Sequence, residues 1–225
     1  MRSLVVVGAG LAGAQAAHAA RALGWDGHLT VVGAEGLAPY DRPPLSKELF
    51  TRTTPAWLRE EIGADLSVAD DVRLAEPATG ISTHQGGVRV RTAGGVVDAD
   101  AAVLATGSRP VLPSRWRART LRTFPDATAL RAAVGPGCRL VVVGAGWIGA
   151  EVAGTAAGAG ADVTVVEAAD APLGGVLGSE VGERTRPWYE AAGVRLLTGS
   201  PAASVDEDGG RVRLTDGTVL EADVV

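Results

Sequence analysis

Two glycine-rich segments have the residue types and spacing that most directly imply chemistry. Residues 8–13 read GAGLAG and residues 144–149 read GAGWIG, each after a short aliphatic run. In a G-x-G-x-x-G loop, the first glycine permits a tight turn and the second lets a pyrophosphate approach the backbone. The third allows close helix–strand packing, and the helix N-terminus attracts the anion. One such loop could be an ordinary strand-to-helix turn, whereas two copies predict two dinucleotide sites.

An acidic residue follows the second expected strand of each half. Glu35 comes after LTVVGA at 29–34, and Glu167 directly follows the strand expected at 163–166. A carboxylate in this place can accept hydrogen bonds from both ribose hydroxyls of an adenosine. Glu35 lies further from its loop than the usual spacing of about 20 residues. The spacing therefore does not decide which residue of this segment faces the ribose. Because Glu167 would repel a 2′-phosphate and no arginine follows it, the second half favours NAD over NADP.

An internal repeat supplies the elements that must position these residues. LVVVGAGLAG at 4–13 matches LVVVGAGWIG at 140–149, and VRVRTAGGVVDADAAVLATG at 88–107 resembles VRLTDGTVLEADVV at 212–225. Each half therefore predicts a β-α-β unit, then a hairpin, then a third strand that begins at an Ala-Asp pair. The predicted fold class is α/β, with two Rossmann-like three-layer dinucleotide-binding domains.

The boundary between the halves is expected where Pro110, Pro113 and the arginine-rich stretch 114–120 break the periodicity. This predicts a first domain over 1–112 and a second over 113–225. A short helix is expected over 126–134, with Asp126 as its N-cap. Aligning the two Ala-Asp pairs places residue 225 inside a strand, so we expect the second domain to end mid-strand. The first is expected to lack its final strand, which leaves both domains incomplete at the C-terminal side.

Composition excludes several function classes. The net charge of −5 argues against nucleic acid or an anionic membrane as the main partner, and the aliphatic runs are too short to span a bilayer. The one cysteine, Cys138, cannot form an internal disulfide, a CxxC redox pair or a cysteine-based metal cluster, and it predicts a reducing cytoplasm. The three histidines have no metal-binding spacing.

The single lysine of the chain is a candidate functional residue. Because arginine supplies the other side-chain positive charges, Lys47 marks a place where an amine could be required.

The string YDRPPLSK at 40–47 adds a specific resemblance. With GAGLAG before it and LATGSRP at 104–110 after it, the chain resembles the FAD-dependent pyridine nucleotide oxidoreductases. More narrowly, it is similar to the ferredoxin–NAD(+) reductases that serve cytochrome P450 and ring-hydroxylating oxygenases, and to rubredoxin reductase and apoptosis-inducing factor. The resemblance implies an enzyme that passes electrons from NADH through FAD to a ferredoxin-like iron–sulfur protein. No cysteine stands in the string, which argues against disulfide or peroxide chemistry.

The resemblance also assigns site residues. The FAD site it implies comprises Gly8, Gly10, Ala12, Gly13, Glu35, Arg42, Lys47, Ala78, Ala105, Thr106, Gly107 and Arg122. The implied NAD site comprises Gly144, Gly146, Trp147, Ile148, Gly149 and Glu167, with Glu151 close to the nicotinamide and the flavin. Lys47 and Glu151 are the implied catalytic pair, in which the ammonium stabilises the reduced flavin. Lys47 could also be an ordinary lysine at a helix start, and Glu151 an acid favoured there by the helix dipole.

Alternatives remain for the acceptor and for the chain itself. A rubredoxin reductase or the flavin component of a nitrite reductase would use the same residues. A truncated, non-catalytic nucleotide-binding fragment is favoured by the expected missing strand and by the absence of a C-terminal domain that family members carry. The cluster Arg115, Arg117, Arg119 and Arg122 could attract an acidic ferredoxin or form a solvated linker.

Overall fold

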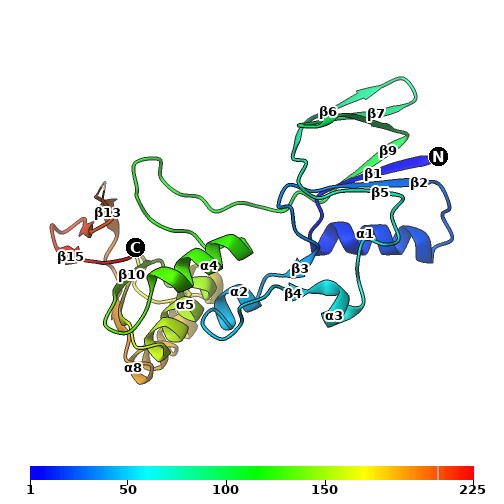
Figure 1. The fold of residues 1–225 in the computed structure, drawn as a ribbon. Coiled ribbons are helices and arrows are strands. Elements are labelled where there is room, and N and C mark those ends of the chain that lie inside the picture. Colours follow the sequence, from blue (N-terminus) through cyan, green and yellow to red (C-terminus); the bar gives the residue numbers. More distant parts are fainter. Residues whose placement is uncertain (207) are drawn as a thin grey trace. The chain divides into compact units, whose positions relative to one another are not determined.

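The chain divides into two compact units in the computed structural model, which describes residues 1–206 and 208–225 (Figure 1). Unit 1 comprises Met1–Asp41 and Pro55–Arg109, and unit 2 comprises Arg42–Thr54 and Pro110–Val225. The later boundary lies close to the one expected after residue 112. The segment Arg42–Thr54 groups with unit 2, although nothing in the periodicity of the sequence indicates this.

Unit 1 is built on a four-stranded parallel sheet whose strand order is β5-β2-β1-β9. Its strands are β1 (Ser3–Val7), β2 (His28–Val32), β5 (Asp71–Arg73) and β9 (Ala101–Leu104). Leu4 and Val6 of β1 pack toward helix α1 (Leu11–Ala22), which buries Ala14 and Ala17 against them. Figure 1 shows α1 lying along one face of the sheet, and its buried residues Gly13, Ala14 and Ala17 are all small.

The opposite face of the same sheet packs against a second sheet. Val5, Val7 and Val32 are buried against Val90 and Val97 of an antiparallel sheet. That sheet comprises β6 (Ala78–His84), β7 (Gly87–Thr92) and β8 (Gly95–Ala99). Because side chains alternate along a strand, β1 serves both layers, and unit 1 has three layers. The remaining elements of unit 1 are β3 (Tyr40–Asp41), β4 (Ala56–Trp57) and α3 (Leu58–Ile62).

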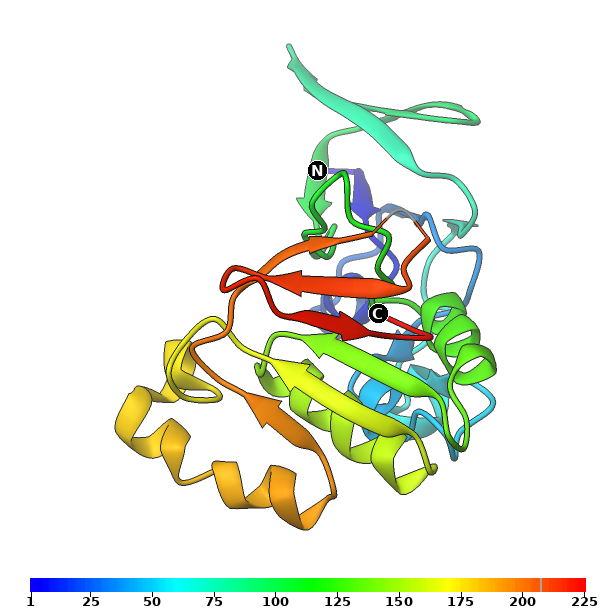
Figure 2. The same cartoon turned by 90° about the vertical axis from the view of Figure 1, so that its left-hand side faces the viewer.

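Unit 2 repeats this plan. Its parallel sheet has the order β10-β11-β12, with β10 (Arg139–Val143), β11 (Asp162–Val166) and β12 (Arg195–Leu197), and helix α5 (Trp147–Gly158) follows β10. Val141 and Val166 pack against Val205, Val212 and Leu220 of an antiparallel sheet, whose strands are coloured orange to red in Figure 2. That sheet comprises β13 (Ala202–Val205), β14 (Arg211–Leu214) and β15 (Val219–Glu221). The short helices α6 (Gly174–Leu177), α7 (Ser179–Glu183) and α8 (Arg186–Ala191) lie between β11 and β12 in the chain.

The repeat extends to the aspartates of the two Ala-Asp pairs. Leu4 of β1 pairs in parallel with Ala101 of β9, whereas the equivalent Leu140 pairs with Val224 in an isolated parallel bridge. The strand expected to begin at the second Ala-Asp pair is therefore reduced to this bridge in the described residues. The N–H groups of Arg2 and Ser3 bind the Asp100 carboxylate and lower its pKa. The Arg139 guanidinium binds Asp223 at 2.6 Å and the Arg139 N–H binds it at 2.8 Å, and together they lower the pKa of Asp223 to about 2.

Helix α4 (Phe124–Ala133) begins two residues before the expected position. The predicted N-cap, Asp126, was wrong: Thr123 is the N-cap, and its hydroxyl accepts the Asp126 N–H. Asp126 is the third helical residue, and its carboxylate accepts the Thr123 N–H at 2.8 Å in a capping box. Pro125 fits the first helical turn because its missing N–H is not needed there.

The segment Arg42–Thr54 contains helix α2 (Pro44–Lys47), which packs against α5 and α4. Arg131 of α4 donates hydrogen bonds to the carbonyl oxygens of Leu49 and Arg52, both at 2.6 Å. These bonds satisfy carbonyl groups that follow a very short helix, so they hold the segment within unit 2. No helix in the described ranges, 1–206 and 208–225, has the length and apolar character to cross a membrane.

Candidate dinucleotide-binding sites

The first glycine loop lies between β1 and α1, as predicted, and its outer glycines are required by packing. Gly8 has a φ of +118°, and a Cβ placed on it would lie 2.1 Å from the carbonyl oxygen of Ala105. A Cβ on Gly13 would lie 1.8 Å from the Gly8 carbonyl oxygen. Gly10 differs, because a Cβ there would meet nothing within 4 Å. The protein therefore leaves open space outside Gly10.

The second glycine loop has nearly the same geometry between β10 and α5. Gly144 has a φ of +104°, and a Cβ on Gly149 would lie 2.0 Å from the Gly144 carbonyl oxygen. A Cβ on Gly146 would meet nothing within 4 Å, and no side chain caps α5 at this residue. The N-terminus of α5 thus offers backbone N–H groups to an anion in this loop. A Cβ on Gly144 would meet nothing within 4 Å, whereas a Cβ on Gly8 would meet the Ala105 carbonyl oxygen.

Glu35 is exposed after β2, and a tyrosine sets the direction of its carboxylate. The Tyr40 hydroxyl donates a hydrogen bond to Glu35 Oε2 at 2.6 Å. Tyr40 is buried and belongs to β3, so it is a rigid support for an exposed acid. Sequence reasoning noticed Tyr40 only as part of the motif, because a hydrogen bond across an irregular loop has no periodicity to reveal it.

Glu167 lies at the end of β11 beside the second glycine loop. Its Oε2 accepts the Ala145 N–H at 2.7 Å, and its Oε1 accepts the Ala169 N–H at 2.9 Å. The acid and the loop predicted to bind NAD are therefore in direct contact. Tyr189 of α8 is buried nearby, and burial, followed by the negative charge of Glu167, raises the pKa of this tyrosine.

The remaining residues expected around the FAD in unit 1 are only partly brought together. The Ala105 N–H donates to the Val7 carbonyl oxygen at 2.8 Å, which fixes this turn beside the first glycine loop. Thr106, Gly107 and Ala12 are exposed at the same end of the parallel sheet. Ala78 begins β6 and is also exposed, but no contact of this residue with the glycine loop is shown.

Lys47 and Glu151 lie together in unit 2. Lys47 Nζ is 4.0 Å from Glu151 Oε1, which is the long limit of an ion pair. The Ser46 hydroxyl lies much closer to the same carboxylate, donating to Glu151 Oε2 at 2.5 Å. The structure therefore joins the two implied catalytic residues and adds Ser46, which sequence reasoning missed.

Arg42 and Arg122 also meet in unit 2. The Arg42 guanidinium donates a hydrogen bond to the Arg122 carbonyl oxygen at 2.5 Å, and the Arg122 N–H donates to Asp126. Arg122 therefore holds the start of the segment Arg42–Thr54 through its backbone.

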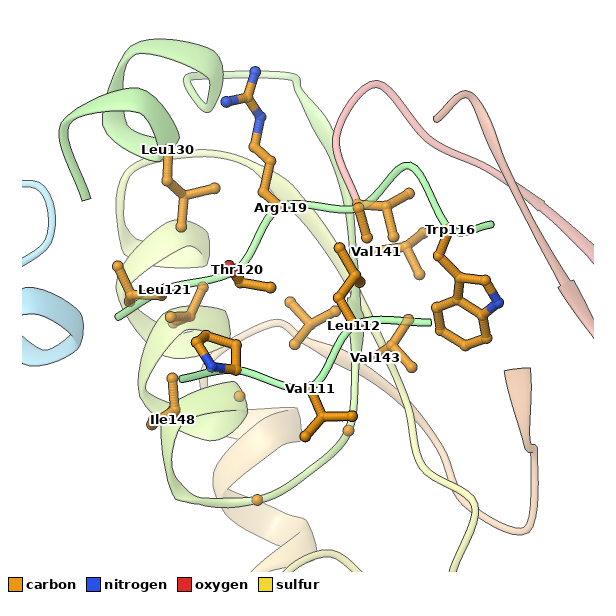
Figure 3. A pocket seen from close by; sticks show the side chains of 18 of the residues that line it. Val111, Leu112, Trp116, Arg119, Thr120, Leu121, Leu130, Val141, Val143 and Ile148 are labelled. Carbon is orange, nitrogen blue, oxygen red and sulfur yellow. The ribbon is translucent and has the colours of Figure 1, made fainter. Parts of the chain in front are cut away.

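A cavity of about 630 Å³ opens beside the second glycine loop. Figure 3 shows Val143 of β10 between Leu112 and Trp116, with Ile148 of α5 to the left of Val111, and all five residues line the cavity. All five loop residues predicted for NAD contribute to its wall, namely Gly144, Gly146, Trp147, Ile148 and Gly149. Trp147 and Ile148 are each about half exposed. The lining is mainly hydrocarbon, so the cavity offers shape and apolar contact.

Within the part of the chain that the structure describes, no group of three histidine, cysteine, aspartate or glutamate residues is placed to hold a metal ion.

Comparison with known proteins identifies relatives of the whole chain. Residues 2–225 match the family described as pyridine nucleotide-disulphide oxidoreductase. The ferredoxin–NAD(+) reductase component of the biphenyl dioxygenase system of Paraburkholderia xenovorans is 37% identical over 99% of the chain, and putidaredoxin reductase of Pseudomonas putida is 34% identical over 99%. The solved covalent putidaredoxin reductase–putidaredoxin complex contains a chain that is 32% identical, with a TM-score of 0.89 over 100% of this chain. The match covers 56% of each of the first two relatives and 57% of the solved chain, so this chain spans about half their length.

Proposed function

The chain belongs to the pyridine nucleotide-disulphide oxidoreductase family, and from this premise we propose that it forms the dinucleotide-binding part of an NADH-dependent flavoprotein reductase. The reductase passes electrons from NADH through FAD to a ferredoxin-like iron–sulfur protein. The observation that carries the proposal is the duplicated loop whose middle glycine faces open space, with an acid after the second strand of each unit. Such a pair is suited to two dinucleotides in one electron relay.

Unit 1 is the proposed FAD-binding unit. Gly8 and Gly13 shape the loop, Gly10 leaves room for the pyrophosphate, and Glu35, held by Tyr40, binds the adenosine ribose. The turn Ala105–Gly107 and the exposed start of β6 at Ala78 complete the proposed contacts. FAD, when bound, supplies an acceptor of hydride and a donor of single electrons.

Unit 2 is the proposed NADH-binding unit. The loop Gly144–Gly149 receives the pyrophosphate at the N-terminus of α5, and Glu167 accepts hydrogen bonds from the ribose hydroxyls. The preference for NADH over NADPH rests on the Glu167 carboxylate, because a 2′-phosphate would bring a second negative charge against it. Trp147 and Ile148 contribute apolar surface at the same loop.

Lys47 and Glu151 are the proposed catalytic pair. The Lys47 side chain is 61% exposed, so its ammonium can approach a ligand, and it would stabilise negative charge on a reduced flavin. Glu151 lies in the first turns of α5, close to the loop that would hold the nicotinamide nucleotide. Arg42 and Arg122 stabilise the segment that presents Lys47.

The proposed electron acceptor is a small acidic iron–sulfur protein of a cytochrome P450 or ring-hydroxylating oxygenase system, and the proposed compartment is the cytoplasm. Two observations support this acceptor: one relative named above is the reductase component of a dioxygenase system, and Arg115, Arg117 and Arg119 are exposed on unit 2. The single cysteine of the chain supports the reducing compartment. An arginine cluster on a chain of net charge −5 gives a local positive surface that can steer an acidic partner.

The visible absorption spectrum of the purified chain, before and after NADH is added without oxygen, tests the proposal. We expect a flavin spectrum that is bleached by NADH. A colourless protein that binds added NADH but no added FAD would contradict the reductase function for this chain and support nucleotide binding alone.

A further inference from the structure

Leu173 of unit 2 has a backbone conformation that is unusual for a residue with a side chain. Among residues 1–206 and 208–225 it is the only non-glycine residue with a positive φ, which is 57°. This left-handed conformation is strained for a residue with a Cβ, and it persists where the surrounding structure requires it. Two glycines, Gly174 and Gly175, follow directly and would adopt it without strain. The contacts of Leu173 must therefore explain why a leucine stands there.

The peptide between Pro172 and Leu173 is held on both sides. The Leu173 N–H donates a hydrogen bond at 2.9 Å to the carbonyl oxygen of Ala145, the second residue of the second glycine loop. On the other side, a Cβ on Gly182 of α7 would lie 2.2 Å from the Pro172 carbonyl oxygen, so α7 packs directly against that oxygen. Leu173 itself is buried. The left-handed turn thus lets one residue bury its side chain and direct its N–H at the glycine loop.

Ala145 is bound at both of its backbone groups. Its N–H donates to Glu167 Oε2 at 2.7 Å, and its carbonyl oxygen accepts the Leu173 N–H. The carbonyl and the following N–H of a trans peptide point in opposite directions, so the bond to Leu173 turns the Gly146 N–H away from Leu173. If this bond were lost, the peptide could rotate and present its carbonyl oxygen, which carries a partial negative charge, to an anion in the loop.

The glycine loop of unit 1 is held in a different way. A Cβ on Gly8 would meet the Ala105 carbonyl oxygen, whereas a Cβ on the equivalent Gly144 would meet nothing within 4 Å. The second loop is therefore held by hydrogen bonds to its second residue and not by a turn packed against its first glycine.

We propose that Leu173 is a positioning residue for the NADH site of unit 2. Its strained backbone N–H holds the Ala145 carbonyl oxygen inward, so that the loop presents N–H groups, and not this oxygen, to the pyrophosphate. The inference rests on the proposed function for the identity of the anion. Because one peptide is oriented before the nucleotide arrives, less of the binding free energy is lost in ordering the loop.

Two substitutions of similar volume test the backbone of Leu173. Leu173→Ile adds a branch at Cβ, which strongly disfavours a positive φ, whereas Leu173→Met is unbranched there. We expect Leu173→Ile to weaken NADH binding about five- to tenfold, because part of the loop must be reordered on binding. Leu173→Met should stay within about twofold of the unmodified chain. Titration with NADH, followed by tryptophan fluorescence, measures both.

Leu173→Gly separates positioning from packing. Glycine keeps the left-handed conformation but removes a buried side chain, so we expect a lower Tm than in Leu173→Met. We nevertheless expect Leu173→Gly to bind NADH more tightly than Leu173→Ile. A residue with only a structural role would give the opposite order, with the weakest binding in the least stable variant, and that order would overturn the proposal.

Gly182→Ala acts on the same peptide from its other side. The new methyl group would displace the Pro172 carbonyl oxygen and with it the Leu173 N–H, so NADH binding should weaken. Gly158→Ala is the matched control, because a Cβ on this last residue of α5 would meet nothing within 4 Å. It should leave NADH affinity unchanged.

Hydrogen exchange of the residue 173 amide, followed by NMR without nucleotide, tests the bond itself. We expect slow exchange in the unmodified chain and exchange about tenfold faster in Leu173→Ile, because the bond to Ala145 opens more often. Equal exchange, or unchanged NADH affinity in Leu173→Ile, would overturn the proposal. If the unmodified chain bound no NADH, the proposed function would be refuted, while the exchange rates would still decide whether Leu173 holds the Ala145 carbonyl.

Discussion

The Tyr40 hydroxyl and the Glu35 carboxylate form a 2.6 Å hydrogen bond that joins a buried strand residue to an exposed acid. A free glutamate side chain at a strand end would sample several rotamers, and ordering it on binding a ligand would cost entropy. Tyr40 fixes one oxygen of Glu35 before any ligand arrives. The acid proposed to bind the FAD ribose is therefore already oriented.

Tyr40→Phe is expected to weaken FAD binding by about three- to tenfold, because one hydrogen bond to a charged group is lost while the ring remains. Fluorescence titration with FAD measures the change. Tyr189→Phe, the same substitution in unit 2, is the matched control and should leave FAD affinity unchanged. Equal FAD affinity in Tyr40→Phe and the unmodified chain would contradict the role given to Tyr40.

Tyr189→Phe itself should leave the free energy of unfolding unchanged or raise it by up to ~1 kcal/mol. The Tyr189 hydroxyl is buried and has no hydrogen-bond partner among residues 1–206 and 208–225. A buried polar group without a partner is unfavourable, so its removal relieves a cost. Urea denaturation followed by circular dichroism measures the effect. A clear loss of stability would mean that the hydroxyl has a partner after all.

Gly8→Ala and Gly144→Ala should differ in cost although both glycines have positive φ angles. The backbone strain of about 1–3 kcal/mol is common to both. Only at Gly8 would the new methyl group also meet a carbonyl oxygen, that of Ala105, at 2.1 Å. We expect Gly8→Ala to lose about 1–3 kcal/mol more than Gly144→Ala in chemical denaturation. Equal losses would show that the Ala105 turn yields without cost.

Glu167→Ala is expected to weaken NADH binding about tenfold or more, since hydrogen bonds to a charged group are lost. NADPH binding should weaken less, because the repulsion of the 2′-phosphate disappears with the carboxylate. Titration of both nucleotides, followed by tryptophan fluorescence, gives the ratio of affinities. Glu35→Ala serves as control and should not alter that ratio. An unchanged ratio in Glu167→Ala would remove Glu167 as the determinant of cofactor choice.

Asp223 should make the stability of unit 2 depend on pH. Its pKa is about 2 in the folded chain, held down by the Arg139 guanidinium, and ordinarily about 3.9 in an unfolded chain. A folded pKa below the unfolded value stabilises the fold above about pH 4, and this stabilisation is lost as the pH falls toward 2. We expect the difference in Tm between the unmodified chain and Asp223→Asn to shrink over that range. A difference that stays constant from pH 7 to pH 2 would contradict the linkage.

The sequence predicted those features that follow from local pattern. The aliphatic runs and glycine spacing placed both loops between a strand and a helix. The Ala-Asp pair predicted the start of β9 after Asp100, whereas after Asp223 the structure shows only an isolated bridge between Val224 and Leu140. The start of α4 was wrong because both Thr123 and Asp126 can cap a helix. Only the backbone shows which of them lies outside it.

The contacts that sequence reasoning missed join residues far apart in the chain. Ser46 and Glu151 are separated by 105 positions, and Arg131 binds carbonyl groups about 80 positions away. No periodicity records such pairs, since each depends on how two helices pack. The grouping of the segment Arg42–Thr54 with unit 2 follows from these contacts and was therefore not predictable from local pattern.

The path of the backbone has a consequence for how such a chain can evolve. The segment Arg42–Thr54 is inserted in the first repeat but completes the second, so no single cut in the gene separates two self-sufficient halves. A recombination event that replaced residues 110–225 with another nucleotide-binding half would part Ser46 from Glu151 and Arg131 from the carbonyl groups that it binds. The two halves are alike in sequence and in fold, but the segment Arg42–Thr54 makes the second depend on a part of the first.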